Sequence, residues 1–258
     1  MDIIKFGTDG WRAIIAKDYT VANVARVAKA TADWMLEDHE NPTVVIGYDC
    51  RFGGPMFTET TAKVLCENGV KVILAKDFIS TPMVSLGALK LGAQSGVVIT
   101  ASHNPPSYNG FKLKSGHGGP SVPAEIDRVE ALIPDSYDVP TTSLEEYQEK
   151  GMIKYMDLES LYVNHAKENF DLAAINNSGL LVAYDAMYGA GQNAVKRLLK
   201  NTLLLHCDYN PSFHGQAPEP IHRNLTELSE LIKKDERVAV GVANDGDADR
   251  IGMYDALS

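Results

Sequence analysis

The chain has 258 residues, of which 45% are hydrophobic and 22% charged, proportions typical of a folded globular protein. Its 34 acidic and 24 basic residues give a net charge of −10, which argues against a broad basic surface for nucleic acid or anionic membrane. Any bound anion must therefore be held by a few local cations. Three cysteines without CxxC spacing argue against a disulfide framework or a zinc site. With no signal core and no apolar run near the roughly 18 residues of a membrane helix, we expect a cytoplasmic protein without a membrane partner.

Strands and helices are predicted to alternate along the first half of the chain. Apolar residues recur at helical spacing over residues 21–35, and runs rich in Val, Ile and Leu indicate buried strands. The predicted helices are 21–35, 56–67, 81–91 and 122–132, and the predicted strands are 43–48, 70–75 and 96–100. This alternation predicts an α/β fold with a largely buried sheet.

A polar segment with two prolines, residues 133–142, interrupts the alternation and indicates a surface connection. After it, Asp157 can cap a helix that runs to about Asn169. The run 44–49 is echoed by 180–185, each followed by glycines, a helix and a strand. We therefore expect two consecutive α/β/α three-layer domains, 1–153 and 154–258, with mixed, mostly parallel sheets, related by internal duplication. The alternative is that two unrelated α/β units share this pattern.

The first segment with chemical potential is Thr-Ala-Ser-His-Asn-Pro-Pro at residues 100–106, which continues to Asn-Gly-Phe-Lys at 109–112. A hydroxyl just past the carboxyl end of a buried strand lies where α/β sheets present reactive groups. Ser102 would need a base or a metal to act as a nucleophile or phosphoryl carrier. Adjacent side chains usually point apart, so His103 does not make a Ser-His hydrolase pair with it. The alternative is a surface turn, in which Asn, Pro and Ser are common for conformational reasons.

The second segment places Asp245, Asp247 and Asp249 on a Gly-containing loop after the apolar run 238–243. Carboxylates at alternate positions can converge on a hard divalent cation, and Mg²⁺ is the expected occupant. An EF-hand starting at Asp245 would need Gly at its sixth position and Glu at its twelfth, where this chain has Arg and Ala. An aspartyl-phosphate phosphatase with Asp245 or Asp247 as nucleophile stays possible, but it leaves Ser102 unexplained.

Two further segments carry weaker signals. Residues 6–13 indicate a turn between two short strands with Arg12 at its exit, and arginine suits bidentate phosphate binding. Alone, Arg12 is more often part of a surface ion pair. Asp49-Cys50-Arg51 could border a cleft, although an ion pair within that loop is favoured. Gly189 and Gly191 lack the spacing of a dinucleotide-binding turn.

Together these segments resemble the α-D-phosphohexomutase family, the phosphoglucomutases and phosphomannomutases. The similar motifs are Phe-Gly-Thr-Asp-Gly-Trp-Arg at 6–12, Thr-Ala-Ser-His-Asn-Pro-Pro at 100–106 with Asn-Gly-Phe-Lys at 109–112, and Asp-Gly-Asp-Ala-Asp-Arg at 245–250. The resemblance implies a phosphoserine at Ser102 and a Mg²⁺ ion bound by its phosphate and by Asp245, Asp247 and Asp249. It also implies that Arg12, His103, Lys112 and Arg250 surround the phosphoryl group. Ala248 stands where many members have Gly, and Asn244 where an aromatic residue is common.

The resemblance implies that phosphate moves between O1 and O6 of a hexose monophosphate through a bound hexose 1,6-bisphosphate. Either His103 or Lys112 would move the proton of the substrate hydroxyl. Family members have four domains, and no segment here resembles the loops of domains III and IV. We therefore expect the N-terminal half, a poor mutase alone. A non-catalytic sugar-phosphate-binding module is a further alternative, and the preferred hexose cannot be read from these residues.

Overall fold

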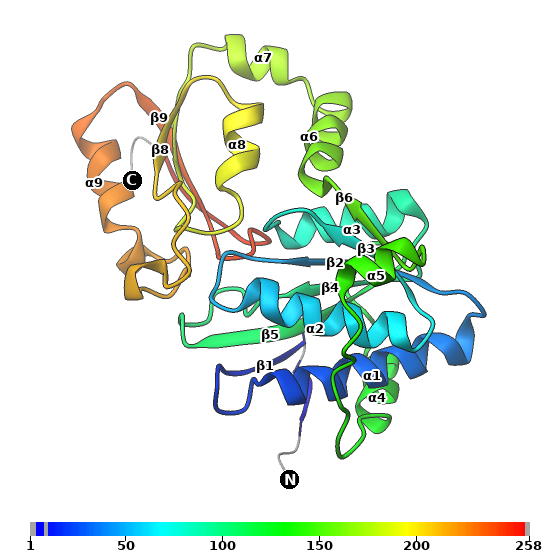
Figure 1. Ribbon diagram of the computed structural model, residues 1–258. Coiled ribbons are helices and arrows are strands. Elements are labelled where there is room, and N and C mark those ends of the chain that lie inside the picture. The colour runs from blue at the N-terminus through cyan, green and yellow to red at the C-terminus, as the bar shows by residue number, and fades with distance from the viewer. Residues whose placement is uncertain (1–3, 8–9, 256–258) are drawn as a thin grey trace.

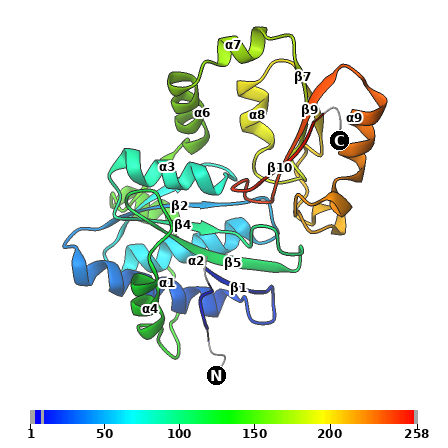
Figure 2. The same ribbon diagram turned by 180° about the vertical axis from the view of Figure 1, so that it is seen from behind.

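The computed structural model describes residues 4–7 and 10–255 and contains two α/β units, each built around one sheet (Figure 1). The turned view in Figure 2 shows the two units stacked, with β1 in one and β10 in the other. The predicted fold class is confirmed: each sheet is mixed, and most strand pairings are parallel.

The first sheet has six strands in the order β1-β5-β4-β2-β3-β6. Their bounds are β1 Trp11–Ile14, β2 Thr43–Tyr48, β3 Lys71–Ala75, β4 Ser95–Ile99, β5 Tyr108–Ser115 and β6 Ile153–Met156. The strands from β4 to β6 along this order run parallel, whereas β5 pairs antiparallel with both β4 and β1. Residues 109–112, expected in the loop after Ser102, therefore lie on β5. The chain turns back along the sheet within a few residues of Ser102.

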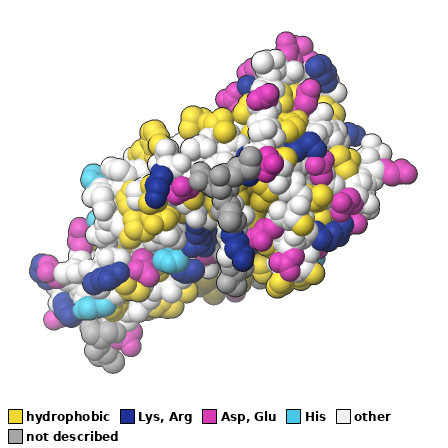
Figure 3. Space-filling model, turned by 90° about the horizontal axis from the view of Figure 1, so that it is seen from below, with side chains coloured by type: hydrophobic (Ala, Val, Ile, Leu, Met, Phe, Trp, Pro, Cys, Tyr) yellow, Lys and Arg dark blue, Asp and Glu magenta, His cyan; other side chains and the backbone are white. Residues whose placement is uncertain are grey.

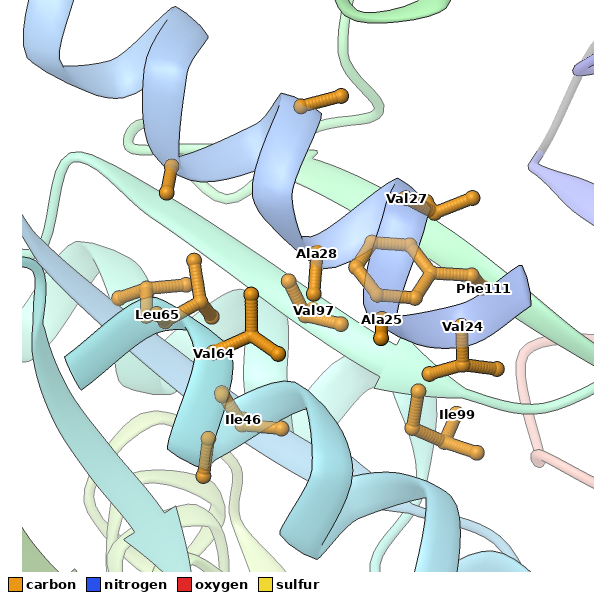
Figure 4. Packing of buried hydrophobic residues seen from close by; sticks show 14 of the residues in the cluster. Val24, Ala25, Val27, Ala28, Ile46, Val64, Leu65, Val97, Ile99 and Phe111 are labelled. Atoms are coloured by element: carbon orange, nitrogen blue, oxygen red, sulfur yellow. The ribbon is translucent and has the colours of Figure 1, made fainter. Parts of the chain in front are cut away.

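Helices cover both faces of this sheet, which gives three layers. Helices α1 (Val21–Asp38) and α2 (Gly54–Glu67) pack together on one face, and α3 (Thr81–Leu91) covers the other. In Figure 4, Ala25 and Ala28 of α1 lie over Val97 of β4. All three are fully buried. Small side chains at these positions let the α1 backbone approach the sheet closely, and the apolar area removed from water stabilises the layer.

The second sheet has four strands in the order β10-β9-β7-β8. Their bounds are β7 Leu181–Asp185, β8 Thr202–Leu205, β9 Val238–Asn244 and β10 Ile251–Asp255. Helix α8 (Gln192–Leu198) and helix α9 (Thr226–Lys234) lie on opposite sides of it (Figure 1). The strand order and directions repeat β5-β4-β2-β3 of the first sheet, with one antiparallel strand at the same end. This repetition supports the expected duplication.

Strand β6 (Ile153–Met156) spans the predicted boundary between the two units. Strand β6 pairs in parallel with β3, so residues on both sides of the 153/154 boundary belong to the first sheet. Helix α6 (Leu158–Asn169) follows, and Asp157 caps it as predicted by accepting from the Ser160 amide at 2.8 Å. We therefore propose that the first domain ends after Met156. The other helices are α4 Pro123–Ala131, α5 Leu144–Glu149, α7 Leu172–Asn177, and the 3₁₀ turns η1 Phe213–Gly215 and η2 His222–Asn224.

One face of the molecule shows how its charged side chains are distributed. On the face shown in Figure 3, basic and acidic side chains are interspersed, and neither sign gathers into one field. Within the part of the chain that the structure describes, none of the helices combines the length and apolar character needed to cross a membrane.

His206 links three elements of the second unit. Its Nδ1 lies 2.9 Å from Asp185 at the end of β7, and its Nε2 lies 3.2 Å from Glu227 on α9. The ring also packs against Tyr188, with ring centroids 4.7 Å apart. The hydrogen bond to Asp185 raises the pKa of His206 above its usual 6.5, against the opposing effect of burial, and Glu227 adds to the rise.

We expect this histidine to make stability depend on pH. Because folding raises the pKa of His206, the protonated ring stabilises the fold fully below pH 6.5, and the contribution is lost as the pH rises through the raised pKa. His206→Gln should therefore lower the melting temperature most at acidic pH, by about 2–4 °C for each kcal/mol lost. The measurement is thermal unfolding between pH 5 and pH 8, with the exposed His39→Gln as control. An equal loss at all pH values would contradict the assignment.

Candidate active site

The site lies where one loop of each unit meets the other. The loop between β4 and β5 carries Ser102, and the loop between β9 and β10 carries the three aspartates, so the two loops leave equivalent strands of the two sheets. Figures 1 and 2 both show the β9–β10 connection reaching the first unit beside α3. The Ser102 hydroxyl donates to Asp245 Oδ2 at 2.7 Å. One hydrogen bond thus joins two residues that are 143 positions apart in the sequence.

The acidic cluster has the chemistry of a cation site. Oxygens of Asp245, Asp247 and Asp249 lie within 4.8 Å of one another. Burial and the charge of Asp247 raise the pKa of Asp245 to about 7. Burial opposes ionisation of Asp247 as well, but the charge of Lys112 lowers its pKa overall. Among the described residues, Asp247 Oδ1 is buried without a hydrogen-bond partner. A buried, unpartnered carboxylate oxygen beside two others fits a divalent cation.

Two groups of the first unit hold Asp247 and Asp249 in place. Lys112 on β5 is buried, and its Nζ lies 2.9 Å from a carboxylate oxygen of each. Thr81, the first residue of α3, donates its hydroxyl to Asp247 Oδ2 at 2.6 Å and its amide to the Asp247 carbonyl at 2.9 Å. The N-terminus of a helix carries partial positive charge, so α3 also favours the anionic form of this aspartate.

The remaining predicted cations lie around the two loops. The Nη1 atom of Arg250 lies 2.6 Å from His103 Nδ1. This contact joins the loop of the three aspartates (the acidic loop) to the loop of Ser102 (the serine loop). Burial and the nearby charges of Arg250 and Arg12 lower the pKa of His103. Arg12 on β1 donates to Asn104 Oδ1 at 2.9 Å. The structure thus brings all eight predicted site residues to one place, including the three aspartates described above.

Close backbone approach explains two glycines. A Cβ added to Gly246 would lie 2.6 Å from the Ser102 carbonyl oxygen. One added to Gly189 would lie 2.8 Å from the carbonyl oxygens of Asp245 and Gly246, so Gly189 supports the acidic loop from behind. Both distances are shorter than any side-chain contact allows. The loops can therefore meet only because these positions have no side chain.

The two departures from the family pattern keep the acidic loop intact. Asn244 accepts from the Tyr184 hydroxyl at 2.9 Å and donates to the Arg250 carbonyl at 2.6 Å, so it ties the two ends of the loop together. Ala248 has a φ of 53°, in the left-handed region that favours glycine. This conformation is a physical reason for a Gly at this position, and the Ala here adopts it at some cost in strain.

Sequence reasoning missed several supporting residues. Thr81 lies in a short polar stretch without a motif, and Thr100 belongs to the serine motif but was given no role of its own. The contacts of Arg51 with the serine loop join residues more than 50 positions apart. The predicted ion pair of Arg51 with Asp49 is present at 3.0 Å. Thr8 and Asp9 of the first motif lie outside the described residues.

Two family models match the chain. Domain I of the phosphoglucomutase/phosphomannomutase family, an alpha/beta/alpha domain, matches residues 4–138, and domain II of the same family matches residues 160–257. The chain belongs to this α-D-phosphohexomutase family. Both matched segments agree with the two units seen in the structure, and neither includes β6.

Individual phosphohexomutases are similar along nearly the whole chain. A probable phosphoglucosamine mutase from Methanothermobacter thermautotrophicus is 32% identical over 97% of this chain and 54% of its own length. A phosphoglucomutase/phosphomannomutase from Thermococcus kodakarensis is 31% identical, with 97% and 55% covered. The crystal structure of a Thermus thermophilus protein assigned as a phosphomannomutase superposes with a TM-score of 0.88 at 33% identity, over 98% of this chain and 57% of that one. The chain thus spans about half the length of the phosphohexomutases that it matches.

The geometry of the aspartates predicts that Mg²⁺ stabilises this chain. Binding to the folded state alone adds about 2.7 kcal/mol when the free ion is at 100 times its Kd. Asp247→Asn, which removes the charge of the carboxylate whose Oδ1 is buried without a partner, should abolish most of the Mg²⁺-dependent shift in melting temperature. Asp235→Asn, in an aspartate paired with Arg237 at the surface, is the control. Equal shifts in both variants would show that the cluster does not bind the ion.

Proposed function

We propose that these two domains carry out the phosphoryl-transfer chemistry of a phosphohexomutase, with Ser102 as the phosphoryl carrier. The observation that carries the proposal is the 2.7 Å hydrogen bond from the Ser102 hydroxyl to Asp245. In this bond the Ser102 hydroxyl oxygen, which would accept the phosphoryl group, lies beside the carboxylates that would hold Mg²⁺. The names of the relatives agree, since they are phosphoglucosamine mutases and phosphoglucomutase/phosphomannomutases.

The proposed roles follow from the contacts. Asp245, Asp247 and Asp249, with the phosphate on Ser102, would hold Mg²⁺, which when bound would neutralise charge on the transferring group. Lys112 contributes a fixed positive charge beside the aspartates, because it is buried and bonded to two of them. Arg12 and Arg250 flank the serine loop and would bind phosphate oxygens.

The reaction needs one proton acceptor. A hydroxyl of the hexose phosphate attacks the phosphorus on Ser102, the bond from phosphorus to the serine oxygen breaks, and the hydroxyl proton passes to His103. Lys112, the other predicted candidate, already holds its proton as the cation paired with two aspartates. The product is a hexose 1,6-bisphosphate, and the proton that the substrate hydroxyl gave to the base is returned to the Ser102 oxygen. The reverse transfer from the other phosphate restores phosphoserine and yields the isomeric hexose monophosphate.

The contacts of Asp245 argue against an aspartyl-phosphate phosphatase. Its Oδ2 accepts from Ser102, and its Oδ1 accepts from the amides of Asp249 and Arg250 at 3.1 Å each. A carboxylate fixed by three donors is oriented as a ligand, and an attack by either oxygen would break these bonds. The second candidate nucleophile, Asp247, is engaged by Thr81 and Lys112 through Oδ2, and its buried Oδ1 is the oxygen that would bind the cation.

The proposal predicts that the chain takes up one phosphoryl group from a hexose 1,6-bisphosphate in the presence of Mg²⁺. Intact mass spectrometry should show the addition in the wild-type chain and in Ser107→Ala, a serine of the same loop, but not in Ser102→Ala. Uptake by Ser102→Ala equal to that of the wild type would rule out Ser102 as the carrier. A phosphoryl group that hydroxylamine removes, and that Asp245→Asn does not take up, would support the phosphatase instead.

The same preparation separates transfer from isomerisation. Because positioning supplies much of the catalysis of phosphoryl transfer, we expect the two domains alone to turn over glucose 1-phosphate far more slowly than they accept phosphate. A coupled assay for the 6-phosphate product measures this rate. Binding of hexose phosphate without any phosphorylation of Ser102 would favour the non-catalytic binding module.

A further inference from the structure

Arg51 is a buried charged side chain beside the site whose nitrogens are all engaged. It follows β2, and its side chain is fully buried. Its Nε pairs with Asp49 at 3.0 Å, and its two terminal nitrogens donate to four carbonyl oxygens of the serine loop. These acceptors lie at 2.6 Å for Ser102, 3.2 Å for Asn104, 3.2 Å for Pro105 and 2.8 Å for Tyr108. One planar guanidinium therefore fixes both ends of the loop that carries Ser102.

A second chain of contacts fixes the other side of the Ser102 backbone. Asp49 Oδ2, the partner of Arg51, accepts from the Thr100 hydroxyl at 2.6 Å. The Thr100 oxygen in turn accepts from the Ser102 amide at 2.8 Å. Arg51 thus holds the Ser102 carbonyl directly and the Ser102 amide through Asp49 and Thr100.

The Ser102 backbone needs this support. Its φ is 53°, in the left-handed region, where residues other than glycine are strained. A strained conformation persists only when its surroundings fix it. Here the two peptide groups of Ser102 are both hydrogen-bonded by the Arg51 network, and the resulting backbone aims the hydroxyl at Asp245.

Arg51 also contacts the second unit. Its guanidinium carbon lies 5.0 Å from the centroid of the Phe213 ring, a cation–π contact. A Cβ added to Gly246 of the acidic loop would lie 3.4 Å from a terminal nitrogen of Arg51. The residue that fixes the serine loop therefore also lies against the loop that carries the aspartates.

We propose that Arg51 is a positioning residue, which holds the strained Ser102 backbone so that the hydroxyl faces the aspartates. The inference rests on the proposed function, in which Ser102 accepts the phosphoryl group. Lysine cannot replace it, because a single ammonium on a flexible chain cannot reach four carbonyls and a carboxylate together. Replacing Arg51 by lysine should therefore slow phosphoryl uptake even where the chain stays folded.

The test compares Arg51→Lys with Arg26→Lys. Arg26 of α1 is also buried and donates to a backbone carbonyl, that of Pro134, at 2.7 Å, but it lies outside the site. At a temperature where both variants are folded, Arg51→Lys should slow uptake of phosphate from hexose 1,6-bisphosphate by about 10- to 100-fold, because transfer depends on geometry. The Mg²⁺-dependent thermal shift should persist in both variants. Rates equal to within about twofold would overturn the proposal.

Two additions keep the test decisive. If Arg51→Lys does not fold, Thr100→Val is tested in its place. This variant removes only the link between Asp49 and the Ser102 amide. Its control is Thr31→Val, at a buried threonine that is hydrogen-bonded within α1. Amide hydrogen exchange over residues 100–108 measures how firmly the loop backbone is held, and it does not require phosphoryl transfer. If the wild-type chain accepts no phosphate, the proposed function fails, and unchanged exchange in Arg51→Lys would then also refute the positioning by Arg51.

Discussion

The site depends on one close approach, that of the Ser102 loop to the Asp245 loop. The hydroxyl-to-carboxylate hydrogen bond of 2.7 Å is possible only because Gly246 has no side chain, since a Cβ there would lie 2.6 Å from the Ser102 carbonyl oxygen. The same approach gathers three carboxylates, a buried lysine and the N-terminus of α3 in one largely buried cluster. Burial strengthens every charge interaction there, so the cluster is stable only when cations and anions nearly balance.

The repeated plan of the two sheets accounts for the position of this contact. In each unit a parallel strand, β4 or β9, passes its chain to an antiparallel neighbour at the same end of the sheet. Loops at the carboxyl ends of parallel strands are where α/β sheets present functional groups. Two copies of one plan, placed with these ends facing, bring a hydroxyl from one and carboxylates from the other to the same point. Neither unit alone has the complete set.

The sequence predicted the residues of the site that lie in continuous motifs. Contacts between the motifs bring these residues together, and the roles given to them stay predictions. Helix α3 and strand β2 also have the predicted bounds, because apolar periodicity and flanking Pro or Gly are local signals. Strand β5 was not predicted, since its Asn-Gly pair is typical of turns and only pairing with β4 and β1 makes it a strand. The roles of Arg51 and Thr81 arise from partners far away in the sequence, and no local pattern encodes them.

Charge balance connects the acidic cluster to the arginines around it. Lys112 offsets one of the three aspartate charges, and a divalent cation would offset the other two, so the cluster with its ion would be close to neutral. A phosphoserine at Ser102 would then add a charge of about −1.5 to −2. Arg12 and Arg250, which flank the same loop, supply two positive charges for it. Arg51 is not available for this purpose, because its donors are committed to Asp49 and the loop carbonyls. The positions of the arginines thus determine what each can do. Arg12 and Arg250, at the edge of the loops, can bind a phosphate, whereas the buried Arg51 holds the backbone of Ser102, which would carry that phosphate.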